Sequence, residues 1–127
     1  MALFDMREPR KIEKCINDPE KVDRDIIRTH ISYIRKKLLV HSIIYYRLNE
    51  SLVSDDQWAR WALELEELTQ TYPDLAQEAF LAEEFKNFDH STGYNLPLET
   101  PWAVDMAIYL VNMHKRYGTR WMEAENR

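Results

Sequence analysis

The protein has 127 residues, of which 45% are hydrophobic and 31% charged, and this is enough chain and enough apolar surface for one globular domain. With two glycines and five prolines, the chain has too few turn formers for an all-β fold with many tight turns. A net charge of −5 without a strong basic patch excludes a typical nucleic-acid-binding surface, so we expect no direct contact with DNA.

The sequence also bears on where the protein works. Its single cysteine, Cys15, cannot form an internal disulfide, so nothing indicates an oxidising compartment. No basic segment followed by an apolar run opens the chain, and no apolar run approaches the length needed to span a membrane. We therefore expect a cytoplasmic protein that does not enter a membrane.

Helical signals dominate the first half of the chain. The segment Arg7–Ile16 predicts a short helix, and Asp18 followed by Pro19 is a typical start for the next one. Beyond them, apolar and aromatic side chains recur at alternating spacings of four and three, which predicts one long helix over about 19–49. This stripe comprises Ile27, Ile31, Ile34, Leu38, His41, Tyr45 and Leu48. Because His41 lies on the stripe, we interpret it as a satisfied core histidine.

A second helix follows after a short break. Ser54 and Gln57 fit a capping box, in which Ser54 caps the helix and the Gln57 side chain reaches back to the Ser54 amide. A helix is therefore predicted over about 55–71, with an inward stripe of Trp58, Trp61, Leu65, Leu68 and Tyr72. Because the connection is short, we expect the two helices to form a long antiparallel hairpin over about 20–75.

The sequence after this hairpin predicts further helices. Tyr72 ends the second helix because it precedes Pro73, and Pro73 starts a third helix predicted over 74–87. The inward side chains of that helix are expected to be Leu75, Ala79, Ala82 and Phe85 or Phe88. The irregular stretch 89–99 precedes the last helix.

The last helix has clear start and stop signals. Thr100 and Pro101 repeat the pattern of a cap followed by proline, and Gly118 marks the end. We predict a single all-α domain over 1–127 with five or six helices.

The tip of the hairpin gathers groups suited to binding. Tyr45 and Tyr46 lie near the end of the first helix, and Asp55 and Trp58 open the second. Aromatic faces and a carboxylate at a helix start suit a flat ring with hydrogen-bonding groups, such as a nucleobase or a pyridine. Packing within the core is the alternative role for these aromatic residues. Asp55 and Asp56 are better explained by capping than by a metal, because no further ligands accompany them.

A longer pattern runs through the same region. The chain carries, in order, His41, Tyr45-Tyr46, Val53-Ser54-Asp55, Trp58-Ala59, Glu64-Leu65-Glu66-Glu67-Leu68 and Tyr72-Pro73-Asp74-Leu75. Over residues 38–75, this pattern resembles the N-terminal helical domain, domain Ia, of bacterial NAD⁺-dependent DNA ligases. The spacing matches without a gap, and the sequence diverges over 76–127.

The resemblance implies a ligand and a role for each residue. In that family the domain closes over the nicotinamide mononucleotide (NMN) half of NAD⁺, and a separate domain adenylates a lysine. The resemblance places Tyr45 and Tyr46 against the nicotinamide ribose and ring and makes Asp55 the first recognition aspartate. Trp58 replaces a family tyrosine and keeps a stacking face without the hydroxyl. Ala59 replaces a second aspartate, which costs about 1.5–3 kcal/mol of binding energy.

The catalytic parts of a ligase do not occur in the sequence. It has no Lys-x-Asp-Gly motif, no glycine-rich phosphate loop and no cysteine cluster for zinc. Asp55 alone is a weak basis for NAD⁺ hydrolysis, so we expect no catalytic residues. The expected function is a non-catalytic module that weakly binds NAD or NMN through Tyr45, Tyr46, Asp55 and Trp58. The alternative is a small accessory or viral protein that keeps the scaffold, has lost the ligand site and binds a host protein.

Overall fold

The computed structural model describes residues 23–118, and every regular element in this part of the chain is a helix. The helices are α2 (Arg24–Tyr46), α3 (Asp55–Thr71), α4 (Pro73–Glu78) and α5 (Pro101–Tyr117). The all-α prediction is thus confirmed for the described part. These four helices do not confirm the predicted five or six, and the predicted helix over 7–16 and the cap at Asp18 lie outside the described residues. None of the described helices has the length and apolar character to cross a membrane.

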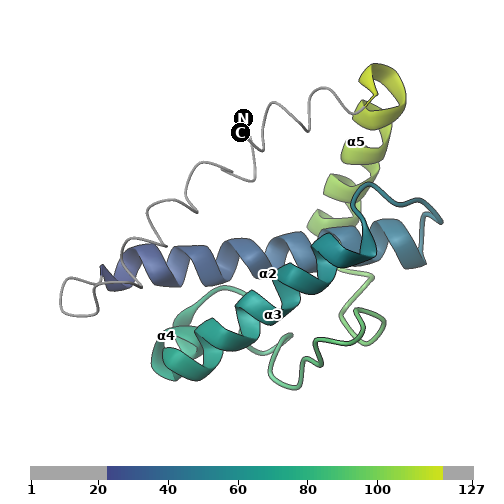
Figure 1. Ribbon diagram of the computed structural model, residues 1–127. Coiled ribbons are helices and arrows are strands. Elements are labelled where there is room, and N and C mark those ends of the chain that lie inside the picture. Colours follow the sequence, from purple (N-terminus) through teal and green to yellow (C-terminus); the bar gives the residue numbers. More distant parts are fainter. Residues whose placement is uncertain (1–22, 119–127) are drawn as a thin grey trace.

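Helix α2 is the central element of the fold, because α3, α4 and α5 all contact it (Figure 1). Its fully buried aliphatic side chains are Ile27, Ile31, Ile34, Leu38, Leu39, Val40, Ile43 and Ile44. Helix α5 stands steeply across the C-terminal half of α2 and contributes Ala103 and Ala107, which are also fully buried. Such small side chains let two helix backbones approach closely.

The ends of α2 are set by local hydrogen bonds and backbone geometry. The Asp23 carboxylate caps the start by accepting hydrogen bonds from the amides of Asp25, at 3.0 Å, and Ile26, at 3.3 Å. After Tyr46 the chain leaves the helix, and Asn49 adopts a positive φ of 56°. Asparagine tolerates this left-handed conformation better than most residues, so the helix ends slightly before the predicted residue 49.

Helix α3 begins as predicted, but its capping box is incomplete. The Ser54 hydroxyl accepts a hydrogen bond from the Gln57 amide at 3.1 Å, which confirms the cap. The Gln57 side chain instead accepts a hydrogen bond from Arg60 at 3.5 Å. Helix α3 folds back across α2 at an oblique angle (Figure 1), so the expected long antiparallel hairpin is not confirmed.

The third predicted helix is much shorter than expected. Helix α4 ends at Glu78, and the prediction of a helix over 74–87 was wrong. Side chains of α2 bond to the backbone of Phe80 in place of the hydrogen bonds that a continued helix would make. The Ser32 hydroxyl accepts a hydrogen bond from the Phe80 amide at 3.0 Å, and Arg35 donates one to the Phe80 carbonyl at 3.2 Å. Leu81, 4% exposed, then enters the core with a positive φ of 66°. These tertiary contacts redirect the chain into irregular structure.

Helix α5 has the predicted bounds, but no side-chain hydrogen bond caps its start. Pro101 is the first helical residue, whereas the Thr100 hydroxyl donates backwards to the Pro97 carbonyl at 2.7 Å and does not cap the helix. Gly118 ends the helix with a φ of 70°, as the sequence predicts.

The contact between α2 and α3 contains buried polar groups. Glu64 accepts a hydrogen bond from His30 Nε2 at 2.7 Å, and this bond holds the pKa of Glu64 below its usual value. The Lys37 ammonium lies over the Trp61 ring at 4.1 Å and the Tyr33 ring at 4.5 Å. Burial lowers the pKa of Lys37 from 10.5 to about 8, although the charge of Glu64 acts in the opposite direction. The loss of hydration therefore outweighs the attraction to Glu64.

Replacing this buried ammonium is expected to stabilise the fold. Lys37→Met keeps most of the apolar stem and should raise the free energy of unfolding at pH 7 by about 1–3 kcal/mol. Between pH 8 and 10.5 the unfolded wild type binds more protons than the folded form, so wild-type stability rises with pH over that range. Lys37→Met should abolish this rise in urea titrations, and Lys36→Met is the matched control. A variant less stable than wild type at pH 7 would contradict the interpretation.

Candidate functional site

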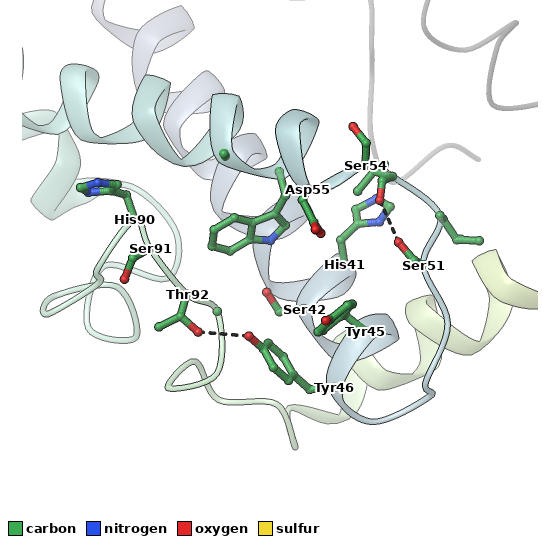
Figure 2. Close-up of a pocket in the computed structure, with 15 residues that line it drawn as sticks. His41, Ser42, Tyr45, Tyr46, Ser51, Ser54, Asp55, His90, Ser91 and Thr92 are labelled. Atoms are coloured by element: carbon green, nitrogen blue, oxygen red, sulfur yellow. Dashed lines mark hydrogen bonds between the residues drawn. The ribbon is translucent and has the colours of Figure 1, made fainter.

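A pocket of about 470 Å³ lies between the end of α2, the start of α3 and the segment 90–93 (Figure 2). All four residues predicted for the site line it, and so does Ala59. The full lining is His41, Ser42, Tyr45, Tyr46, Ser51, Leu52, Val53, Ser54, Asp55, Trp58, Ala59, His90, Ser91, Thr92 and Gly93.

The aromatic side chains of the pocket pack beside it and leave it open. The Tyr45 ring meets the edge of Tyr46 with centroids 4.9 Å apart and planes at 85°, and Tyr45 is 54% exposed. Trp58, partly buried, packs against Phe88 at 6.1 Å. Because these rings contact other aromatic partners, the space between Tyr45 and Trp58 remains available for a ligand.

The third wall of the pocket comes from segment 90–93, which the sequence reasoning did not include in the site. Thr92 and Tyr46 share a hydrogen bond between their hydroxyls at 3.1 Å, and His90 Nδ1 lies 2.6 Å from a Glu66 carboxylate oxygen on α3. The segment is thereby tied to both helices. The one available signal was Gly93, the only glycine of the long irregular stretch 89–99.

Gly93 packs tightly against the pocket floor. A Cβ atom at this position would lie 2.1 Å from Ser42 Oγ, 2.9 Å from Ser42 Cβ and 3.1 Å from Trp58 Cζ2. Only a residue without a side chain fits there unless the segment moves. The absence of a side chain at Gly93 thus sets how closely the third wall approaches α2.

Two neighbouring residues of α2 form a polar floor. Ser42 is 2% exposed, and neither its hydroxyl nor His41 Nδ1 has a hydrogen-bond partner. The interpretation of His41 as a satisfied core histidine was therefore wrong. Its ring lines the pocket and packs against the Trp61 ring, with the two centroids 5.5 Å apart. Burial, followed by the nearby charge of Lys37, lowers the pKa of His41 from 6.5 to about 4, so the imidazole is neutral at pH 7.

The charges around the pocket favour a neutral or positively charged ring, and the described lining offers no cation for a phosphate group. Among the described residues that line it, Asp55 is the only carboxylate and none is lysine or arginine. Besides the two tyrosines, five serine and threonine residues line the space, namely Ser42, Ser51, Ser54, Ser91 and Thr92. Within residues 23–118, no group of three or more His, Cys, Asp or Glu side chains is arranged to hold a metal ion. The arrangement suits a flat ring with hydroxyl or amide groups.

Comparison of the chain with protein-family models, with curated proteins and with solved structures finds no match. The likeness to ligase domain Ia therefore depends on the residues quoted from the sequence.

A side chain at position 93 is expected to disturb the pocket. Gly93→Ala should lower the free energy of unfolding by about 1–3 kcal/mol, because the new methyl group overlaps Ser42. Urea denaturation measures the loss. Ser42→Gly removes both clashing atoms, so the double variant should lose less stability than the sum of the two single variants. Strictly additive losses would contradict the close packing of Gly93 on Ser42.

Stability should fall in acid because of His41. Its folded pKa of about 4 lies below the unfolded value of 6.5, so the unfolded state binds more protons between these values. As the pH falls from 6.5 to 4, the free energy of unfolding should drop by about 1–3 kcal/mol on account of this group. His41→Gln should show a correspondingly smaller drop, whereas the exposed control His90→Gln should retain the drop due to His41. Equal acid sensitivity in wild type and His41→Gln would refute the assignment.

Proposed function

We propose that the protein is a non-catalytic binding module that weakly binds a nicotinamide nucleotide in the pocket between α2 and α3. The observation that supports this most is the clustering of Tyr45, Tyr46, Asp55 and Trp58 around one open pocket. Its volume of about 470 Å³ falls in the range typical of small-molecule sites, roughly 300–1,000 Å³. NMN or the NMN half of NAD⁺ is the proposed ligand, and a cytoplasmic location fits a ligand of this kind.

Each side chain has a proposed part in binding. Trp58 and Tyr45 offer ring faces for the pyridinium, whose positive charge favours both aromatic faces and the Asp55 carboxylate. The hydroxyls of Ser91 and Thr92 line the same pocket and are the proposed partners of the ribose hydroxyls. Ala59 lines the same pocket but offers only a methyl group. Binding is therefore expected to be weak.

Restoring a carboxylate at position 59 tests the proposal by a gain of affinity. Ala59→Asp should tighten NMN binding by roughly 10–150-fold, because an added charged hydrogen-bond partner contributes about 1.5–3 kcal/mol. Isothermal titration with NMN and NAD⁺ measures the change. Leu63→Asp is the matched control, because it adds the same charge one turn further along α3, outside the pocket lining. No heat at millimolar NMN with either wild type or Ala59→Asp would refute the proposed function.

A second candidate is a protein-binding role, as expected of an accessory or viral protein that docks onto a host factor. The specific observation is a row of exposed tyrosines, because the Tyr46 ring contacts both Tyr45 and, at 5.4 Å, Tyr94. Tyr94 is 65% exposed. Tyrosine is enriched at protein interfaces. Tyr94→Ser should weaken partner capture without changing NMN affinity if this role holds, because Tyr94 lies outside the pocket lining.

A further inference from the structure

The carboxylate of Asp55 is an exposed charge at the pocket that the fold does not use. Asp55 lies in the first turn of α3, and Figure 2 shows its side chain directed toward the end of α2. Among residues 23–118, no hydrogen bond or ion pair engages this carboxylate. Glu64 and Glu66 of the same helix are by contrast paired with His30 and His90. Asp55 therefore stays available to a ligand.

Three aromatic residues, Tyr45, Tyr46 and Trp58, line the same pocket as Asp55. The two tyrosines are exposed and Trp58 is partly buried, so a group from solvent can reach all three rings. The face of an aromatic ring attracts a cation, and a neighbouring carboxylate adds to this attraction. No lysine or arginine of the described lining competes for these groups. The combination suits a positively charged guest.

The shape and the hydrogen-bonding groups of the pocket favour a guanidinium over an ammonium. A guanidinium is planar, stacks on aromatic rings and carries five N–H donors. Asp55 offers two acceptor oxygens, and Ser91 and Thr92 add hydroxyl oxygens from the third wall. An ammonium is compact and strongly hydrated, so it gains less from flat walls. An arginine side chain also brings no anionic group, and the lack of a cation in the described lining does not disfavour it.

Two features outside the pocket favour a protein as the source of this side chain. The Tyr46 ring contacts Tyr94, which is exposed and lies outside the lining. A ligand confined to the pocket leaves Tyr94 uncovered, whereas the polypeptide around an anchored arginine can lie on it. In addition, residues 48–105 carry 13 aspartates and glutamates against two lysines and arginines. This acidic balance attracts a basic partner.

We propose that the pocket binds an arginine side chain of a basic partner protein, with the guanidinium paired with Asp55 and stacked on Tyr45. Tyr46 and Tyr94 then contact the residues that flank this arginine. The inference goes beyond the nucleotide role and gives the chemistry of the partner in the second candidate role. It does not require that a nucleotide binds.

Peptides that differ in one side chain test this proposal. Acetyl-Gly-Gly-Arg-Gly-Gly-amide should bind the full chain at least about 5-fold tighter than the same peptide with citrulline, which is planar and similar in size but uncharged. The peptide with lysine should bind at least about 2-fold more weakly than the arginine peptide. An NMR titration measures the affinities and should show the largest shifts at the amides of residues 54–59.

Variants of the protein locate the binding groups. Asp55→Asn should weaken binding of the arginine peptide by roughly 3–10-fold. Asp56→Asn is the matched control, because it removes the same charge from the same helical turn but outside the lining, and its effect should stay below about 2-fold. Tyr45→Leu should weaken binding by roughly 2–5-fold. Its control is Tyr109→Leu, which removes a ring of similar exposure, 55%, from α5.

The possible outcomes separate this inference from the nucleotide role. Equal binding of the arginine and citrulline peptides, equal losses in Asp55→Asn and Asp56→Asn, or no binding at millimolar peptide overturns the inference. A lysine peptide that binds as tightly as the arginine peptide overturns the assignment to arginine. NMN is titrated separately. Binding of NMN without binding of the peptide leaves only the nucleotide role, and the reverse result supports the arginine site alone.

Discussion

The burial of α2 on nearly all sides is the constraint on which the rest of the structure depends. A helix with one apolar stripe needs a single partner, but α2 has fully buried aliphatic side chains around much of its circumference and contacts all three other described helices. Its polar residues are consequently drawn into the interior as well. His30, Arg35, Lys37 and Ser42 are all at most 5% exposed. The position of every other element follows from covering this helix.

The buried polar groups of α2 are satisfied to different degrees. Ser32 and Arg35 bond to the backbone around Phe80 and fix the chain after α4. His30 is bonded to Glu64 on α3. Toward the C-terminal end of α2, by contrast, Ser42 Oγ and His41 Nδ1 have no partner. His30 Nδ1 and Arg35 Nε are also buried without a partner, so these two side chains are only partly satisfied, whereas the Ser42 hydroxyl makes no hydrogen bond at all.

Much of the helical plan could be predicted because its signals are local. The cap at Ser54, the proline starts of α4 and α5 and the stop at Gly118 depend on residues within one turn of each other. The end of α4 could not be predicted in this way. The segment after Glu78 has helical periodicity, but α2 side chains bond its backbone and the core accepts Leu81 at a positive φ. Long-range contacts overrode local preference there.

The candidate site also has features set by local sequence signals and features set by long-range contacts. The sequence alone determined which residues meet at the junction of α2 and α3, because Tyr45, Tyr46, Asp55 and Trp58 follow from a helix end, a short turn and a helix start. The tertiary structure decided that the junction is open, that segment 90–93 forms its third wall, and that His41 and Ser42 form its floor. These features depend on Gly93 approaching a helix some fifty residues earlier in the chain. No local pattern encodes such a contact, because its geometry is fixed only when the whole core has packed.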